Sequence, residues 1–368
     1  MQTLSMTCEA WQDVLGRLPP ELDLDALAMS SGALKRRREV GDGAMLLRLA
    51  MARGPGGLSL RQTAAWAAMQ GLARLSDPAV KYRLDHAVPF LKAVLEQQLA
   101  ERAGSVALCW PGRSLCIVDG THLQQPGSRG SDWLIHAGFD LGRGGFSHLE
   151  LTDKHGAESL ARGPARPGEV RIGDRNFAHA KILAEWRAQS RGQADFIVRA
   201  GWKAFALSHS DGSAFDLIAH LQTLPRECQL HEVVVRAKLG QTEALPLRLI
   251  ILRQSAERTE HIRRRLRRSA PRKQHTLDPR SLVAAEFLIL ATSLPIALYP
   301  AKEVLAVYRL RWQIEMAFKR LKSLLHIDQL PTRTPAASQS WLYAHLILAL
   351  LCDDLSQEFL DFSPSGVA

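Results

Sequence analysis

The sequence predicts an α/β protein with a helical N-terminal region, and three observations support that class. Residues 1–105 read as helical throughout. Residues 106–200 hold short apolar runs separated by turn residues, which is typical of strands. Residues 308–322 contain neither Gly nor Pro, and their apolar side chains recur every three or four positions, as in an amphipathic helix.

The composition indicates a soluble protein with a polyanionic partner. The chain has 368 residues, 46% of them hydrophobic, and a formal net charge of +10. A chain of this length is expected to form two or three domains, and its charge favours nucleic acid over a membrane as partner. Five scattered cysteines without a C-x-x-C pair indicate no disulfide framework, and no signal peptide is visible. We therefore expect a cytoplasmic protein with no membrane partner.

The N-terminal region, residues 1–105, contains a candidate DNA-binding helix pair. Ser59-Leu-Arg-Gln62 has the pattern of a capping box, and Ser76-Asp-Pro78 is expected to cap a second, basic helix after Gly71. A helix, a short turn and a basic helix form the helix-turn-helix arrangement. Most helical pairs bind no DNA, so the surplus of positive charge is what favours this function. The candidate DNA contacts are Arg61, Lys81 and Arg83.

Two predicted strands in the region 106–200 each end on an aspartate, Ser114–Asp119 and Glu169–Asp174. Further strands are expected at 133–141, 146–152 and 195–199, with a helix at 178–188. This order suits an RNase H-like α/β core, in which the first and fourth strands lie side by side. Asp119 and Asp174 would then face a common active site.

Paired carboxylates on neighbouring strands, with a third from a helix, predict a site for divalent cations. Oxygen ligands suit two Mg²⁺ or Mn²⁺ ions, which promote attack on a phosphodiester. A single Asp near a loop is more often a turn or cap residue, so Asp119 and Asp174 matter as a set with Glu315. Asp153 and Glu158 are the nearest rival carboxylates.

The helix predicted over 308–322 places four polar side chains within about 60° of one another, at about 100° per residue. They are Tyr308, Arg311, Glu315 and Lys322. On an arbitrary helix, a solvated surface with an ordinary Arg311–Glu315 pair would be the default interpretation. The two preceding aspartates favour a functional face instead.

The order of these motifs resembles the bacterial insertion-sequence transposases of the DDE type, in the group named after insertion sequence four. Residues 308–322 match that group's YREK pattern, Asp119-Gly-Thr121 its first acidic motif and Gly173–Phe177 its second. The resemblance covers residues 40–350. It implies that Asp119, Asp174 and Glu315 form a metal-binding catalytic triad. It also implies that Tyr308, Arg311 and Lys322 contact DNA phosphates beside the cut.

The 141 positions between Asp174 and Glu315 indicate an insertion, which in this family is a mostly β domain. We assign it to residues 201–295, between two parts of the core at 106–200 and 296–368. Strands are expected at 228–238, 245–254 and 286–293. The resemblance also implies double-stranded DNA as partner, a homodimer on that DNA, and a bacterial, nucleoid-associated protein.

Two features of the insertion have competing interpretations. Residues 258–273 hold seven arginines and a lysine, which indicate a phosphate-tracking surface or a solvated helix face. Its candidate DNA contacts are Arg264, Arg265 and Arg268. Trp202 lies where some relatives stack a tryptophan on a flipped base, and a packing role is equally compatible with the sequence.

The predicted function is therefore transposition. The protein would bind terminal inverted repeats, hydrolyse a phosphodiester at each end with Mg²⁺, and use the freed 3′-hydroxyl for strand transfer. Two alternatives remain open on the sequence. One is an RNase H-like nuclease without strand transfer. The other is a non-catalytic DNA-binding repressor or inhibitor derived from a transposase.

Overall fold

The computed structural model describes residues 8–104, 108–240, 243–272, 274 and 276–361, and the chain divides into two compact units. Unit 1 comprises Met1–Ala107, Gly120–Gly156 and Ile314–Ala368. Unit 2 comprises Leu108–Asp119 and Ala157–Gln313. Strand β1 (Ser114–Leu123) and helix α12 (Trp312–Ser323) each contribute residues to both units.

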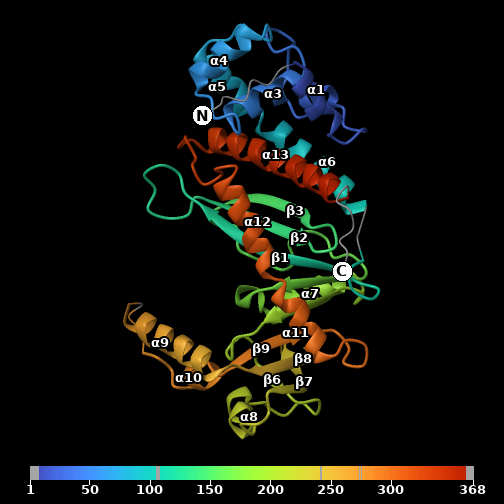
Figure 1. Cartoon of the computed structure of the whole chain (residues 1–368), viewed down its shortest axis with the longest axis vertical. Helices are drawn as coiled ribbons and strands as arrows, with labels where there is room; N and C mark the ends of the chain where they lie inside the picture. Colours follow the sequence, from blue (N-terminus) through green and yellow to red (C-terminus); the bar gives the residue numbers. More distant parts are fainter. Residues whose placement is uncertain (1–7, 105–107, 241–242, 273, 275, 362–368) are drawn as a thin grey trace. The chain divides into compact units, whose positions relative to one another are not determined.

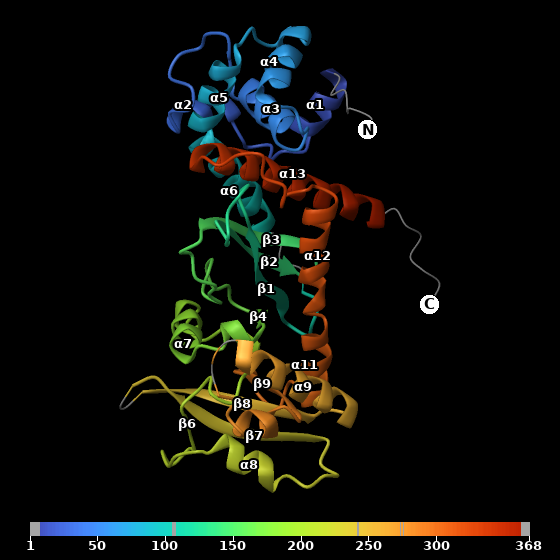
Figure 2. The same cartoon turned by 90° about the vertical axis from the view of Figure 1, so that its left-hand side faces the viewer.

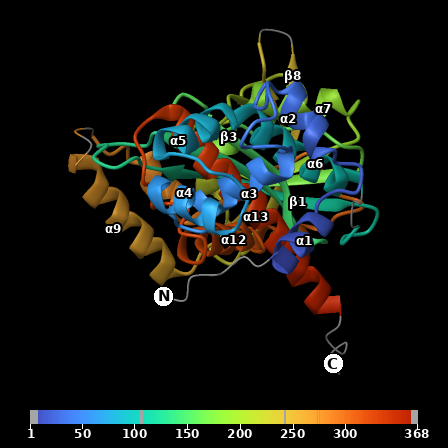
Figure 3. The same ribbon diagram turned by 90° about the horizontal axis from the view of Figure 1, so that it is seen from above.

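Unit 1 is built around the long helix α13 (Pro335–Asp361), which packs against α3, α5, α6 and β3 (Figure 1). Seen from above, α13 lies beneath the N-terminal helices (Figure 3). Its inward residues Leu342, Leu346, Ile347 and Leu350 are fully buried, so their burial stabilises the unit. The other elements of unit 1 are α1 (Cys8–Gly16), α2 (Leu24–Ser30), α3 (Gly43–Arg53), α4 (Leu60–Met69), α5 (Asp77–His86), α6 (Val88–Gly104), β2 (Trp133–Asp140) and β3 (Gly145–Asp153). Strands β2 and β3 are antiparallel, and β2 also pairs with β1.

Of the two predicted helix caps, the capping box at Ser59 is confirmed, and the side-chain cap expected at Ser76 is absent. Ser59 Oγ accepts the Gln62 N–H at 3.2 Å, and Gln62 Oε1 accepts the Ser59 N–H at 2.9 Å, which completes the capping box of α4. Ser76 is the N-cap of α5, but its side chain makes no capping hydrogen bond. Pro78 instead favours the start of this helix, because its fixed φ suits a first turn.

Unit 2 contains a mixed sheet in the order β1-β4-β5-β9-β8-β7-β6 (Figure 2). Strands β1, β4 and β5 are parallel, and the rest pair antiparallel. The bounds are β4 (Glu169–Gly173), β5 (Asp195–Arg199), β6 (Leu207–Ser208), β7 (Leu230–Lys238), β8 (Ala244–Arg253) and β9 (Phe287–Thr292). The predicted pairing of the first and fourth strands is thus confirmed. The strands of the predicted insertion continue this sheet through the β5–β9 pair.

Helices of unit 2 cover this sheet and extend from it. They are η1 (Arg175–Phe177), α7 (Ala180–Gln189), α8 (Leu217–Thr223), α9 (Ala256–Arg272), α10 (Arg280–Ala284) and α11 (Ala301–Arg309). Trp186 of α7 and Phe196 of β5 are fully buried in the same hydrophobic core. Among the described residues, none of the helices is both long and apolar enough to cross a bilayer.

Two predicted elements differ in the structure. The helix expected over 308–322 is interrupted, because α11 ends at Arg309 and α12 begins at Trp312. At the break, the Leu310 and Arg311 amides donate to carbonyls three residues back, and the Leu310 side chain is 39% exposed. The rotation of about 100° per residue therefore cannot be applied continuously from Tyr308 to Lys322 to place their side chains on one face. Strand β1 also continues past Asp119 to Leu123, because its second half pairs with β2.

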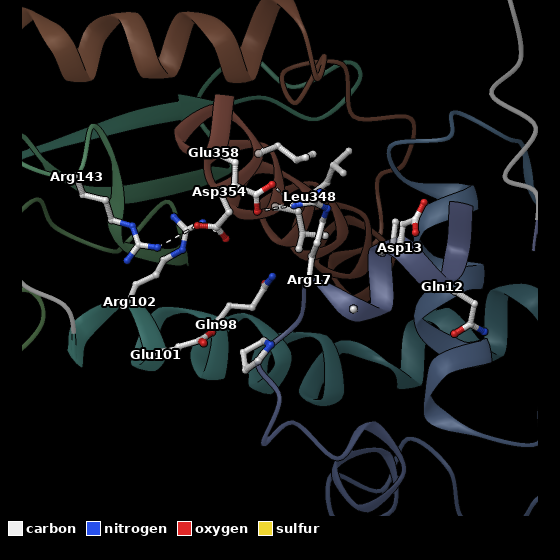
Figure 4. Close-up of a pocket in the computed structure, with 15 residues that line it drawn as sticks. Gln12, Asp13, Arg17, Gln98, Glu101, Arg102, Arg143, Leu348, Asp354 and Glu358 are labelled. Atoms are coloured by element: carbon white, nitrogen blue, oxygen red, sulfur yellow. Dashed lines mark hydrogen bonds and ion pairs between the residues drawn. The ribbon is translucent and has the colours of Figure 1, made fainter. Parts of the chain in front are cut away.

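A cavity of about 1010 Å³ with polar and apolar lining residues lies in unit 1 among α1, α6 and α13 (Figure 4). Its wall carries the buried Arg102, which is 2.7 Å from Asp354 and 3.7 Å from Asp353. Arg102 also donates to the carbonyls of Phe146 and Leu350. One guanidinium thereby links α6, β3 and α13. None of the predicted site residues lines this cavity.

We expect Arg102→Ala to lower the free energy of unfolding by about 3 kcal/mol, because it removes the cation paired with the mostly buried Asp353 and leaves Asp354 with Arg143 alone. Urea denaturation followed by circular dichroism measures this change. The matched control is Lys92→Ala on the same helix, whose pair with Glu96 spans 3.6 Å and is exposed. It should change stability by no more than about 0.5 kcal/mol. Equal effects of the two substitutions would contradict a structural role for Arg102.

The buried His345 of α13 makes unit 1 sensitive to acid. Its Nδ1 lies 2.8 Å from the Trp341 carbonyl oxygen, and burial lowers its pKa to about 4. Between pH 6.5 and 4 the unfolded state therefore binds a proton that the folded state does not. Stability conferred by the neutral ring should fall by about 3 kcal/mol as the pH drops through this range. Urea titrations at several pH values should show a shallower pH dependence for His345→Gln than for the wild type, and identical slopes would contradict the prediction.

Candidate active site

The two predicted aspartates lie beside each other in unit 2. The parallel register of β1 and β4 pairs Ile117 with Ile172, and each aspartate follows its isoleucine by two residues. The backbone at Asp174 is extended, so continuing the register places Asp119 level with Asp174. Because strand side chains alternate between faces, both carboxylates project from the same face as the paired isoleucines. The pairing of β1 with β4 therefore supports the predicted proximity of the two aspartates, which stays a prediction.

Two residues of the YREK pattern accompany these acids. The Arg311 Nη1 lies 3.9 Å from Asp119 Oδ2, and both side chains are 22% exposed. Burial raises the pKa of the Tyr308 hydroxyl, while Arg311, which hydrogen-bonds to it, and Arg199 act in the opposite direction. Asp174 is close enough to raise the same pKa. Tyr308 and Arg311 thus lie close to the two aspartates, Arg311 through its contact with Asp119 and Tyr308 through the effect of Asp174 on its pKa.

Two arginines that the sequence did not indicate as site residues lie at this edge of the sheet. The register of β4 and β5 pairs Gly173 with Val198, so Arg199, the last residue of β5, is level with Asp174. Burial lowers the pKa of Arg199, and the neighbouring Arg175 lowers it further. Arg175 extends over Gly201, where an added Cβ would lie 3.5 Å from its Cδ. Arg199 ends a predicted strand, as Asp174 does, and this shared position in the sequence could have indicated that Arg199 belongs to the site.

Glu315 and Lys322 belong to the part of α12 that lies in unit 1. Glu315 is exposed in the first turn, where the helix dipole favours a negative charge. Both side chains line a cavity of about 490 Å³ together with Phe318, Lys319, Ser323 and Asp328. The predicted spacing of seven residues therefore places Glu315 and Lys322 along one face of α12.

The acid pair offers oxygen ligands of the kind that bind divalent cations. Within the described part of the chain, no group of three or more His, Cys, Asp or Glu side chains is arranged to hold a metal ion. Asp119 and Asp174 nevertheless supply two carboxylates that follow the paired residues of neighbouring strands, and hard oxygen donors suit Mg²⁺ or Mn²⁺. The donor chemistry of these two residues therefore fits the predicted ions.

The arginine-rich segment forms helix α9, and the structure shows which of its arginines form ion pairs. Glu286 binds both Arg263 at 2.5 Å and Arg253 at 3.1 Å, and Arg267 is 3.3 Å from Glu260. The three predicted contacts are exposed, and none has an ion pair within 4 Å among the described residues. These are Arg264, Arg265 and Arg268. At the other end of α9, Arg258 is close enough to influence the pKa of Arg199.

The structure shows packing interactions for Trp202. Its indole N–H donates to Ser281 Oγ at 3.2 Å. The cationic groups of Lys203 and Arg280 lie 4.6 and 4.4 Å from its ring centroid. Trp202 is also packed against the hydrophobic core of unit 2. These contacts account for the residue as a packing tryptophan, and base stacking stays a prediction.

The candidate DNA contacts of the N-terminal helices differ in accessibility. Arg61 is exposed in the first turn of α4. Lys81 is exposed on α5 and forms an i,i+4 ion pair with Asp85. Arg83 is half-buried near the end of α5. Of the three, Arg61 and Lys81 are therefore the more accessible to a polyanion.

Comparison with known proteins agrees with this geometry. Residues 110–351 match the family described as "Transposase DDE domain". The InsL protein of insertion sequence element IS186A from Escherichia coli K12 is 39% identical over 357 residues, which cover 96% of each chain. The transposase of IS421 from Escherichia coli is 39% identical over 358 residues, again 96% of each chain. The transposase of IS231F from Bacillus thuringiensis subsp. israelensis is 31% identical over 117 residues, 32% of this chain and 24% of its own.

A solved piggyBac transposase synaptic complex with hairpin DNA aligns with 94% of this chain and 74% of its own. Its TM-score of 0.42 and identity of 10% are too low to carry a structural conclusion. The family match and the nearly full-length bacterial relatives are decisive. The chain belongs to the DDE-domain transposases of insertion sequences, a family of enzymes that act on DNA.

Proposed function

We propose that this transposase belongs to the YREK group and cuts and joins DNA at the ends of its element by a two-metal mechanism. The observation that carries the proposal is the parallel pairing of β1 with β4, two residues before Asp119 and Asp174, together with the contact of Arg311 with Asp119 and the effect of Asp174 on the pKa of Tyr308. The strand order and directions around β1 and β4 support an RNase H-like core over residues 106–200 and 296–368. Residues 201–295 would be the insertion.

In this proposal Asp119, Asp174 and Glu315 form the metal-binding triad. Glu315 follows Arg311 by four residues in the sequence, and Arg311 lies 3.9 Å from Asp119, which supports including the glutamate in the triad. Bound Mg²⁺ or Mn²⁺ ions would supply activation of the attacking oxygen and stabilisation of the leaving oxygen. The side chains of the triad would hold the ions by their oxygens.

The surrounding cations would bind the phosphates at the cut. Arg311 and Tyr308 would contact nonbridging oxygens beside the scissile bond, with Lys322 contacting the same strand. Arg199 stays charged despite its lowered pKa, because guanidinium does not deprotonate in proteins. Water attack would break the phosphorus–oxygen bond and leave a 3′-hydroxyl. That hydroxyl would then attack a phosphate of the target DNA. A new phosphorus–oxygen bond would form, and the 3′ oxygen of the target strand would leave.

DNA binding would extend beyond the cut. The helices of residues 1–105 would bind terminal inverted repeats through Arg61, Lys81 and Arg83. Arg264, Arg265 and Arg268 of α9 would track phosphates, and Trp202 would stack on a base if Arg280 moves aside. Two copies of the chain would pair the two ends of the element as a homodimer on DNA.

We expect Asp119→Asn, Asp174→Asn and Glu315→Gln each to reduce cleavage by on the order of 10³-fold or more, since each removes a charged metal ligand. The assay uses labelled DNA carrying the native element's end, with Mg²⁺ or EDTA, and gel shift monitors binding. Glu185→Gln, on the exposed face of α7, is the matched control and should cleave normally.

Full cleavage by all three triad variants would contradict the proposed site. Cleavage without a joined product when target DNA is supplied would support a nuclease instead of a transposase. Tight binding without cleavage by the wild type under any divalent metal would support a non-catalytic DNA-binding protein.

Replacing Arg264, Arg265 and Arg268 together by Ala should weaken DNA binding and flatten its salt dependence. If each contacts one phosphate, the slope of log affinity against log salt should fall by about 2.7. Fluorescence anisotropy with duplex DNA at several salt concentrations measures this slope. Arg267→Ala is the control, because its charge is already paired with Glu260. An unchanged slope in the triple variant would exclude α9 as a phosphate-tracking surface.

A further inference from the structure

Asp174 is held by its own turn. One of its side-chain oxygens, Oδ1, accepts the backbone N–H of Asn176 at 2.7 Å, which caps the 3-10 helix η1. Gly173 allows this turn to fold closely over β4, because an added Cβ there would lie only 2.9 Å from Phe177 Cβ. The orientation of the Asp174 carboxylate therefore depends on the position of Asn176.

Asn176 is in turn held by a residue from another segment. Its side-chain amide Nδ2 donates to Glu158 Oε2 at 3.2 Å, across 18 positions of sequence. Asn176 is exposed and has little packing around its side chain. Among the described contacts, the hydrogen bond to Glu158 is the one that holds the position of this side chain. Glu158, Asn176 and Asp174 thus form a chain of hydrogen bonds that ends on the proposed metal ligand.

The loop that carries Glu158 is fastened to the same strand that presents Asp174. Arg171 of β4 is 5% exposed, and its guanidinium donates to backbone carbonyl oxygens of this loop. The acceptors are Leu160 at 2.6 Å, Arg162 at 2.7 Å, Gly163 at 3.4 Å and Pro164 at 2.9 Å. Arg171 also pairs with the buried Glu169 at 2.8 Å and lies 4.9 Å from the Trp186 ring centroid. A loop held by this many contacts to one buried cation keeps Glu158 at a defined distance from Asp174.

We propose that Glu158 is a positioning residue for Asp174, acting through Asn176. The inference rests on the proposed role of Asp174 as a metal ligand. Its physical basis is that a ligand fixed before binding loses less conformational freedom when the ion arrives, so its partners influence metal affinity. Glu158 needs only to accept a hydrogen bond for this purpose. A glutamine, which offers the same acceptor, should replace it.

The test measures Mn²⁺ binding by the full-length protein on DNA carrying the native element's end. Electron paramagnetic resonance reports free Mn²⁺ directly, without depending on catalysis. Glu158→Ala and Asn176→Ala should each raise the half-saturating Mn²⁺ concentration about 10-fold, as losses of outer-shell partners commonly do. Glu158→Gln should bind as the wild type does. The double Ala variant should be no worse than either single one, because both break one chain of contacts.

Matched controls separate this inference from the proposed function. Asp153→Ala removes an exposed carboxylate that caps only its local turn, and it should leave Mn²⁺ binding unchanged. Thermal unfolding should show that all variants remain folded. If Glu158→Gln is as impaired as Glu158→Ala, the charge itself is required and the positioning role is wrong.

Parallel titration of Asp174→Asn distinguishes the two failures. If Asp174→Asn binds Mn²⁺ as the wild type does, the proposed metal role of Asp174 fails. If Asp174→Asn loses Mn²⁺ while Glu158→Ala retains it, only the role of Glu158 fails.

Discussion

The parallel pairing of β1 with β4 is the interaction on which the candidate active site depends. Both strands are buried over their paired residues, and Ile117 and Ile172 are fully inaccessible. A shift of the register by one residue would turn one strand's side chains to the opposite face and separate the two aspartates. Burial of apolar side chains on both strands therefore fixes the spacing of the polar groups that follow them. The hydrophobic core and the acid pair are two consequences of one register.

Two neighbouring carboxylates repel each other, and Arg311 lies 3.9 Å from Asp119. In the absence of DNA, Arg311 offsets part of the negative charge of Asp119. Arg199 at the end of β5 and Arg175, next to Asp174 in the sequence, add two further guanidiniums at this edge of the sheet. They are also the groups that bind phosphate most readily. The same residues can therefore stabilise the empty site and take part in binding the substrate.

The position of each arginine around the axis of α9 decides whether it forms an ion pair within the protein or is exposed to a polyanion. Arg263 donates to the carbonyl of Leu282 in α10 and is paired with Glu286, which also binds Arg253 of β8. Arg264, Arg265 and Arg268 turn toward solvent on the other side. Composition alone does not distinguish these roles, because every member of the cluster is an arginine. The periodicity of the helix and the location of a single glutamate assign them.

The sequence by itself determined the order of the core strands along the chain and the capping box of α4, because these follow from local pattern and residue chemistry. It predicted β5 over Asp195–Arg199 with the bounds that the structure shows. It did not reveal the break after Arg309, the continuation of β1 beyond Asp119, or the presence of Arg199 beside the acids. Each of these depends on which distant segment pairs with or packs against the residue. Only the tertiary structure decides such contacts, since strand register and side-chain burial arise from the whole fold and not from neighbours along the chain.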